Sequence, residues 1–175
     1  MSMSIFNGAI LKEHLLLLDK KRQLAFGAVC CERLLPNYLA FQQSTGWGDI
    51  SYIRKALDCV WASLRGQSLS LQEIKKLTDS CESVAPNSED FDSLYVTSAQ
   101  DACFAVCSLL DYLLENNVDK VVQVATYATD SVDLYVQEIE NMASNDPQLE
   151  KKILMHRLMQ RELIQQDKDL KMIEQ

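Results

Sequence analysis

Residues 118–143 read VDKVVQVATYATDSVDLYVQEIENMA, and the apolar spacing in this stretch decides the fold class. Apolar side chains recur every three or four residues, which is the period of one face of an α-helix. They form one stripe: Val121, Val124, Ala125, Ala128, Val132, Tyr135, Val136 and Ile139. The opposite face is polar and carries four carboxylates: Asp119, Asp130, Asp133 and Glu140. The stretch therefore predicts a long amphipathic helix with an acidic outer face.

Local capping signals divide the first half of the chain into further helices. Side chains of Asp, Asn, Ser and Thr accept hydrogen bonds at helix N-termini, and they recur here before apolar-periodic segments. Four of them are predicted N-caps: Asn7, Asp19, Asp49 and Ser70. Pro36 is expected to end one helix (20–35) and begin another, because proline cannot continue a helix but suits its first turn.

The second half of the chain carries similar signals. Thr97-Ser98-Ala99-Gln100 has the spacing of a capping box, so we predict that a helix begins there. Asn116 and Asn117 interrupt the periodic pattern before the long amphipathic helix. Asn145-Asp146-Pro147 is expected to end that helix and to start a single last one, with Pro147 in its first turn.

Scarce glycine and proline argue against a β-sandwich or barrel. The 175 residues include 5 glycines and 3 prolines, whereas average usage would supply about 21 of the two together. Hydrophobic residues make up 47% of the chain, which is ample for a packed core. We therefore predict an all-α fold: one domain over residues 1–175, built as an irregular bundle of about seven helices.

Composition also bounds the compartment and the partners. The amino end lacks a basic region of the signal-peptide kind, and no stretch approaches the ~18 apolar residues of a membrane span. We expect a cytoplasmic protein whose 6 cysteines are thiols. The net charge of −8 disfavours direct contact with nucleic acid or with an anionic membrane.

The charges are strongly segregated along the chain. Residues 1–76 have a balance of +4 and residues 151–175 a balance of +2, whereas residues 77–150 hold 15 acidic side chains and one basic one, Lys120. One interpretation is that these carboxylates are solvated helix faces, placed partly at helix N-termini. The other is a surface shaped for a basic partner, because a one-sign surface costs self-repulsion.

If the second interpretation holds, one group of residues is our first choice for the binding surface and another is our second choice. The first group lies on the acidic face of the 118–143 helix: Asp119, Asp130, Asp133 and Glu140. The second group lies in the long irregular segment 85–96: Glu89, Asp90 and Asp92.

Signatures of catalysis or cofactor binding are weak. His14 and His156 stand far apart without a second ligand at helical spacing, so we predict no metal site. No glycine-rich phosphate loop occurs, and Cys103 and Cys107 fit small core residues. Asp90 and Asp92 leave an acid–base pair open as an alternative. Our prediction is a protein that is not an enzyme and has no cofactor.

Two blocks of sequence resemble the YjaG-like family, a bacterial family of unknown function. The first block is Cys31-Glu32-Arg33-Leu34-Leu35-Pro36-Asn37-Tyr38 with Phe41 and Thr45-Gly46-Trp47-Gly48-Asp49, and the second is Pro86 with Glu89-Asp90-Phe91-Asp92 and Asp101-Ala102-Cys103. The resemblance covers roughly residues 20–115 and fades after Asn117. Most of these residues have structural explanations, including Phe91 as an anchor for its loop. Glu32 and Arg33 are expected to form an internal ion pair.

The resemblance implies an all-helical fold and brings no established activity, cofactor or catalytic residue. Relatives of this kind occur as stand-alone proteins and as immunity proteins beside toxin genes. By this analogy, our first hypothesis is a cytosolic immunity protein of the contact-dependent inhibition type, which neutralises a basic toxin, specifically a nuclease. The alternative is a signalling or adaptor protein with no toxin partner, and an enzyme that uses loop carboxylates is a third.

Overall fold

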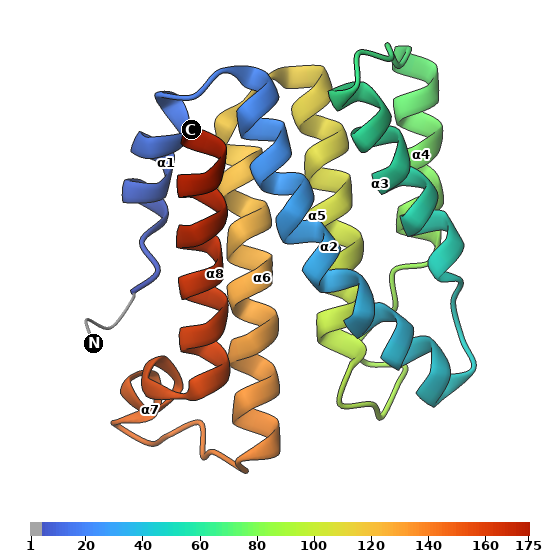
Figure 1. The fold of residues 1–175 in the computed structure, drawn as a ribbon. Coiled ribbons are helices and arrows are strands. Elements are labelled where there is room, and N and C mark those ends of the chain that lie inside the picture. The colour runs from blue at the N-terminus through green and yellow to red at the C-terminus, as the bar shows by residue number, and fades with distance from the viewer. Residues whose placement is uncertain (1–4) are drawn as a thin grey trace.

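Eight α-helices make up residues 5–175, the part of the chain that this computed structural model describes (Figure 1). No strand occurs among these residues, which confirms the predicted all-α class; residues 1–4 of the predicted domain lie outside them. The helices are α1 (Gly8–Leu16), α2 (Lys20–Thr45), α3 (Ile50–Leu64), α4 (Leu71–Ser83), α5 (Val96–Glu115), α6 (Val118–Ile139), α7 (Leu149–Met155) and α8 (Arg157–Glu174).

The predicted N-caps are confirmed by their hydrogen bonds. Asp19 Oδ1 accepts from the backbone N–H of Arg22, and Ser70 forms a complete capping box with Glu73. Asn7 and Asp49 cap α1 and α3 in the same way. These caps work through residues two or three positions away, so the sequence alone locates them.

The predicted interruption at Pro36 is wrong, because α2 continues through it to Thr45. Pro36 itself is exposed, while Leu34, Leu35 and Tyr38 around it are buried. Each buried large side chain contributes about 1.5–3 kcal/mol, and several together exceed the ~3 kcal/mol that an internal proline costs a helix. Packing therefore keeps the helix continuous.

Two boundaries in the second half also differ from the prediction. Helix α5 begins at Val96 and not at the predicted capping box, since Val96 is buried and its N–H donates to the Ser93 carbonyl. The last helix is divided at His156, whose backbone is extended and whose ring caps α8. Helix α7 starts at Leu149, so Pro147 precedes it.

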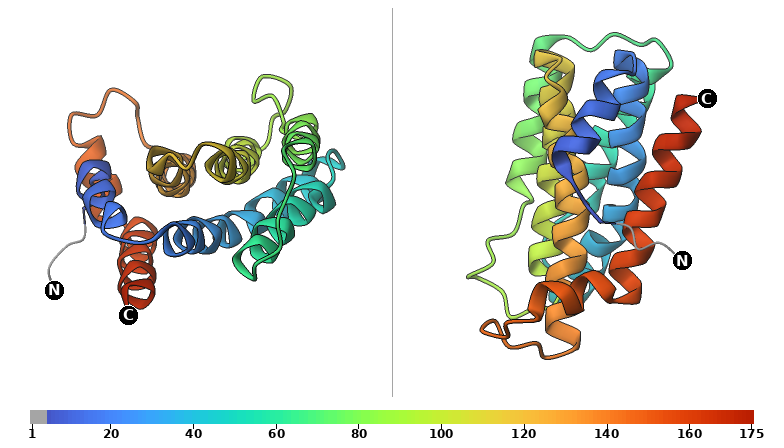
Figure 2. Two further views of the ribbon diagram at one scale, coloured as in Figure 1. Left: turned by 90° about the horizontal axis from the view of Figure 1, so that it is seen from above. Right: turned by 90° about the vertical axis from the view of Figure 1, so that its left-hand side faces the viewer.

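The helices form two rows with α5 near the centre (Figure 2). One row contains α2 and α3 and the other contains α4, α5 and α6, while α8 packs on the edge formed by α2 and α6. Helix α5 is buried on most of its surface, including Cys103 and Cys107 as predicted. Helices α2 and α5 approach closely at Gly27, where an added Cβ would lie 2.4 Å from Leu109 Cδ2.

A second, smaller apolar cluster lies apart from the main core. It consists of Val136 on α6, Ile153 on α7, and Met159 and Leu163 on α8. The main core draws on α1 to α6 and on Leu170 in the last turns of α8. The first half of α8 therefore packs on a different set of side chains from its end. Within residues 5–175, no helix combines the length and the apolar character needed to cross a membrane.

Candidate functional site

The four predicted carboxylates of α6 lie along one solvent-facing strip but do not converge. Asp119 is in the first turn and Glu140 is the C-cap, so a rise of 1.5 Å per residue separates them by about 30 Å. Asp119 Oδ1 forms an ion pair with Lys12 Nζ at 2.7 Å, and Glu140 Oε1 lies 3.5 Å from His156 Nε2. The two ends of the strip are therefore already in contact with basic side chains of this chain.

Asp130 and Asp133 occupy the middle of the strip, one turn apart. Neither forms an ion pair within the described residues; Asp133 accepts a hydrogen bond from Gln137. Partial burial raises the pKa of Asp130, and the nearby charge of Asp133 raises it further. This pair is a concentration of negative charge that the fold itself leaves without a counterion.

The loop carboxylates Glu89, Asp90 and Asp92 are exposed in the connection between α4 and α5. Asp92 lines a groove of about 300 Å³ together with Leu134, Tyr135 and Glu138 on α6. The fold thus brings Asp92 of the loop next to the C-terminal half of α6. Glu138 was missed, because it does not lie on the acidic stripe of the predicted helix.

The single base of residues 77–150 does not neutralise this region. Lys120 Nζ lies 2.8 Å from Asp111 Oδ2 and 3.9 Å from Glu115 Oε1, near the opposite end of α6. We call the remaining carboxylates at the C-terminal half of α6 and in the loop the acidic end: Glu89, Asp90, Asp92, Asp130, Asp133, Glu138 and Glu140.

Arg33 connects α2 to α8 through an ionic cluster. Its Nε and Nη2 donate to the two oxygens of Glu162 at 3.0 and 2.9 Å, and its Nη1 donates to Asp169 at 2.5 Å. The Val29 carbonyl and the Cys30 sulfur accept the remaining N–H groups. All five donors of the guanidinium are in use, so Arg33 holds the helices together and has none left for a ligand.

Glu32 points to the other side of α2 and pairs with α3. It accepts two hydrogen bonds from Arg54, at 2.7 and 2.9 Å, and one from Trp61 Nε1 at 2.7 Å. These donors lower the pKa of Glu32. The expected ion pair between Glu32 and Arg33 is therefore wrong: adjacent residues lie about 100° apart on a helix, and each contacts a different neighbouring helix.

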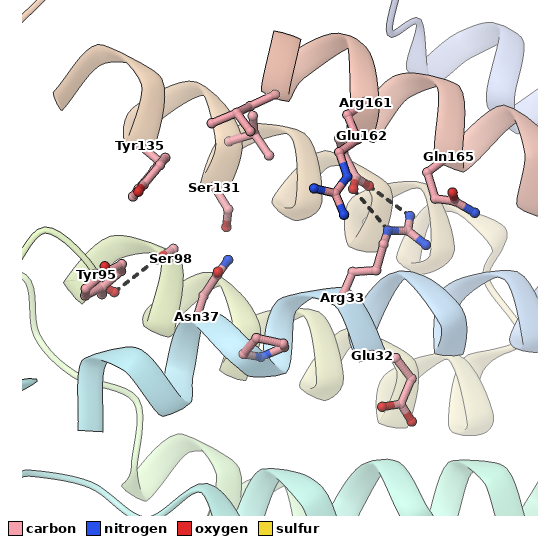
Figure 3. A pocket seen from close by; sticks show the side chains of 13 residues that line it. Glu32, Arg33, Asn37, Tyr95, Ser98, Ser131, Tyr135, Arg161, Glu162 and Gln165 are labelled. Atoms are coloured by element: carbon pink, nitrogen blue, oxygen red, sulfur yellow. Dashed lines mark hydrogen bonds and ion pairs between the residues drawn. The ribbon is translucent and has the colours of Figure 1, made fainter. Parts of the chain in front are cut away.

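An open cleft of about 610 Å³ lies between α2, α5, α6 and α8 (Figure 3). Asn37 reaches into it from α2 and Arg161 from α8, on opposite walls. Tyr95 and Tyr135 line its far end, with ring centroids 6.2 Å apart and planes 19° from parallel. Sequence reasoning did not single out Arg161, because nothing in its local pattern indicates that α8 packs beside α2.

A family model described as "Protein of unknown function (DUF416)" matches residues 11–175. The chain belongs to the DUF416 family. The resemblance to YjaG-like proteins is confirmed, and the family model extends past Asn117 to the end of the chain.

Two uncharacterized bacterial proteins are similar to this chain in sequence. Uncharacterized protein YjaG of Escherichia coli K12 is 36% identical over 93 residues, which are 53% of this chain and 47% of that protein. An uncharacterized protein of Haemophilus influenzae is 27% identical over 110 residues, 62% of this chain and 56% of that one. The aligned segments thus span about half the length of these curated relatives.

A crystal structure of a DUF416 family protein from Shewanella baltica OS155 has a similar fold. Its TM-score is 0.83 at 25% sequence identity, over 93% of this chain and 83% of that chain.

The two sequence blocks that resemble the YjaG-like family meet in an aromatic cluster. Phe91 packs edge-on against Phe41 at 5.1 Å between ring centroids and lies 5.2 Å from Trp47, which confirms its predicted role as an anchor. Tyr38 Oη donates to the Val84 carbonyl at 2.7 Å. Gly48 has φ +85, and a Cβ there would lie 2.3 Å from Tyr38 Oη. These residues of the blocks position the loop that carries Asp92.

Burial raises the pKa of two titratable groups inside this DUF416 domain, Asp101 and Cys30. Asp101 is buried beside Ser131, whose hydroxyl donates to it at 2.9 Å, and burial raises the pKa of Asp101 to about 6. Burial likewise raises the pKa of the Cys30 thiol to about 12, so that thiol stays protonated and is a poor nucleophile at neutral pH. All six cysteines are free.

Proposed function

We propose that this chain is a binding protein that captures a basic partner protein through its acidic end. The observation that carries the proposal is a set of four carboxylates that are exposed or half-buried and form no ion pair among the described residues: Asp92, Asp130, Asp133 and Glu138. No lysine or arginine occurs between Lys120 and Lys151 in the sequence. A surface of one sign attracts an oppositely charged partner and speeds its association.

The partner we propose is a toxin, specifically a nuclease, and the chain is then its cytoplasmic immunity protein. A nuclease needs a positively charged active site to hold phosphate. An acidic antagonist competes for that site with the same kind of charge that the substrate carries. Electrostatic capture of this kind weakens as salt screens the charges beyond the Debye length of about 10 Å at 0.1 M.

A signalling or adaptor role is the second candidate. The observation that favours it is the cleft between α2 and α8, which is built partly from the sequence block 31–38 and is not lined by the unpaired carboxylates of the acidic end. An adaptor would bind one of the cell's own proteins and give no protection against a toxin.

The test is affinity capture of basic proteins at about 0.05 M and 0.3 M salt. One variant combines Asp130→Lys, Asp133→Lys and Glu140→Lys. A matched variant makes the same charge change at exposed carboxylates elsewhere, with Glu13→Lys, Asp79→Lys and Glu82→Lys. We expect the wild type and the matched variant to retain a basic partner that high salt releases, and the first variant to lose it.

Equal retention by both folded variants would contradict the acidic end as the binding surface. Growth protection separates the two candidates: co-expression with the captured protein rescues cells only if that protein is a toxin. A captured partner that is harmless to the cell would support the adaptor role.

A further inference from the structure

The cleft between α2 and α8 contains one charged group that the fold leaves unused. Four carboxylates and two guanidiniums lie in or next to it, and most are saturated. Glu162 is held by Arg33 and Gln166, Asp169 by Arg33 and Gln165, and Glu32 by Arg54 and Trp61. Asp101 lies behind Ser131 and accepts a hydrogen bond from the Ser131 hydroxyl, and burial raises the pKa of Asp101.

Arg161 differs from these groups. It lines the cleft, its side chain is exposed, and it has no hydrogen bond or ion pair among the described residues. The carboxylates on the walls already accept hydrogen bonds from this chain. The charged group of the cleft that has no partner among the described residues is therefore a cation, the guanidinium of Arg161. A ligand that completes it is an anion.

Asn37 provides a second unsatisfied polar group on the opposite wall. In the motif block 31–38, Glu32 and Arg33 bind neighbouring helices, and Leu34, Leu35 and Tyr38 are buried. Asn37 is half-buried, extends into the cleft and forms no hydrogen bond within the described residues (Figure 3). Its amide can donate to an anion that Arg161 holds.

The rest of the lining fits an apolar or planar body. Val132, Leu158 and Pro36 contribute apolar surface, and Tyr135 stacks on Tyr95 at the end of the cleft. A concave site of about 610 Å³ with aromatic side chains and a few polar groups on its walls has the size and character of small-molecule sites in proteins.

We propose that this cleft binds a small organic anion, with a carboxylate or phosphate group at Arg161 and Asn37 and an apolar or aromatic body against Tyr135. This inference does not depend on the proposed partner, because Arg161 and Asn37 lie outside the acidic end. Carboxylate and phosphate ligands of this kind have the same two features: one anionic group and an apolar body about the size of a ring.

The test is an NMR titration of the isotopically labelled full chain with benzoate, phenyl phosphate and benzyl alcohol as probes. We expect benzoate, phenyl phosphate or both to cause saturable shifts in the amides near Asn37, Tyr135 and Arg161. Saturation by one probe alone identifies the anionic group as carboxylate or phosphate. The uncharged benzyl alcohol should bind at least about tenfold more weakly, since it lacks the charge-assisted hydrogen bonds.

Two charge-neutralising variants on the same helix make the test specific. Arg161→Gln should weaken anion binding at least about tenfold, to the level of benzyl alcohol. Arg157→Gln removes the same charge one turn earlier on α8, outside the cleft, and should leave the affinity unchanged. Both arginines are exposed, so both variants should fold. The proposal is overturned if neither anion gives saturable shifts at millimolar concentration, or if Arg161→Gln binds as tightly as the wild type.

Discussion

The guanidinium of Arg33 on α2 meets the carboxylate of Glu162 on α8 through two parallel hydrogen bonds of 3.0 and 2.9 Å. The two residues are 129 positions apart in the chain. Asp169, about two turns further along α8, contacts the same guanidinium. Both carboxylate side chains are largely buried, so this cluster is the main polar connection between the edge helix and the rest of the bundle.

Replacing Arg33 by Gln is expected to destabilise the protein by about 3 kcal/mol, because Glu162 and Asp169 would remain buried without a counterion. Urea unfolding followed by circular dichroism measures the change. The control is Arg22→Gln on the same helix, where the arginine is exposed and lies 3.9 Å from Asp19. That variant should change the free energy of unfolding by less than about 0.5 kcal/mol. Similar losses in both variants would rule out a special role for the Arg33 cluster.

Gly48→Ala should cost more stability than Gly66→Ala. Both glycines have positive φ, which alone costs an alanine about 1–2 kcal/mol, but only the Cβ at position 48 would meet another atom, Tyr38 Oη at 2.3 Å. Removing that hydroxyl with Tyr38→Phe should recover part of the extra loss, so the double variant is more stable than the sum of the two single changes. Strict additivity in thermal unfolding would exclude the close contact as the cause.

Asp101 should make stability depend on pH between about 4 and 6. Its pKa is about 6 in the folded protein, against 3.8 for an unperturbed aspartate, so the folded state binds the proton more tightly than the unfolded chain does. The stabilising effect is complete below about pH 4 and is lost as pH rises through 6. Relative to Asp101→Asn, which keeps an acceptor for Ser131, the wild type should lose about 1–3 kcal/mol over this range. A constant difference between the two proteins at pH 4, 5, 6 and 7 would contradict the raised pKa.

Pro36→Ala should stabilise the protein by about 1 kcal/mol or more. The alanine N–H restores a hydrogen bond to the Glu32 carbonyl within a helix that already continues through this position. Asn37→Ala is the neighbouring control and should shift the free energy of unfolding by no more than about 0.5 kcal/mol. A loss of stability in Pro36→Ala would mean that the proline contributes through its own packing or through the unfolded chain.

Features that depend on near neighbours in the chain were accessible from the sequence. The caps at Asn7, Asp19 and Ser70 act within three residues, and the apolar period of residues 118–143 marks α6 directly. The continuation of α2 through Pro36 was not accessible, because it depends on packing against other helices.

The candidate sites divide in the same way. The excess of carboxylates in residues 77–150 is visible in the sequence, and so is the anchoring role of Phe91. The ion pair between Lys12 and Asp119, and the groove that Asp92 and Glu138 both line, depend on how α1, α6 and the loop are arranged in space. Nothing near Arg161 in the sequence marks it as a site residue. It becomes a candidate only because α8 packs beside α2, which places Arg161 and Asn37 in the same cleft.

The separate apolar cluster of Val136, Ile153, Met159 and Leu163 has a consequence for motion. Because these side chains are not part of the main core, α7 and the first half of α8 are expected to open as a unit, with loss of the Arg33–Glu162 contact, while α2 and α5 stay folded. Amide hydrogen exchange would then show lower protection in residues 149–163 than in α5. Such opening would widen one wall of the cleft without global unfolding.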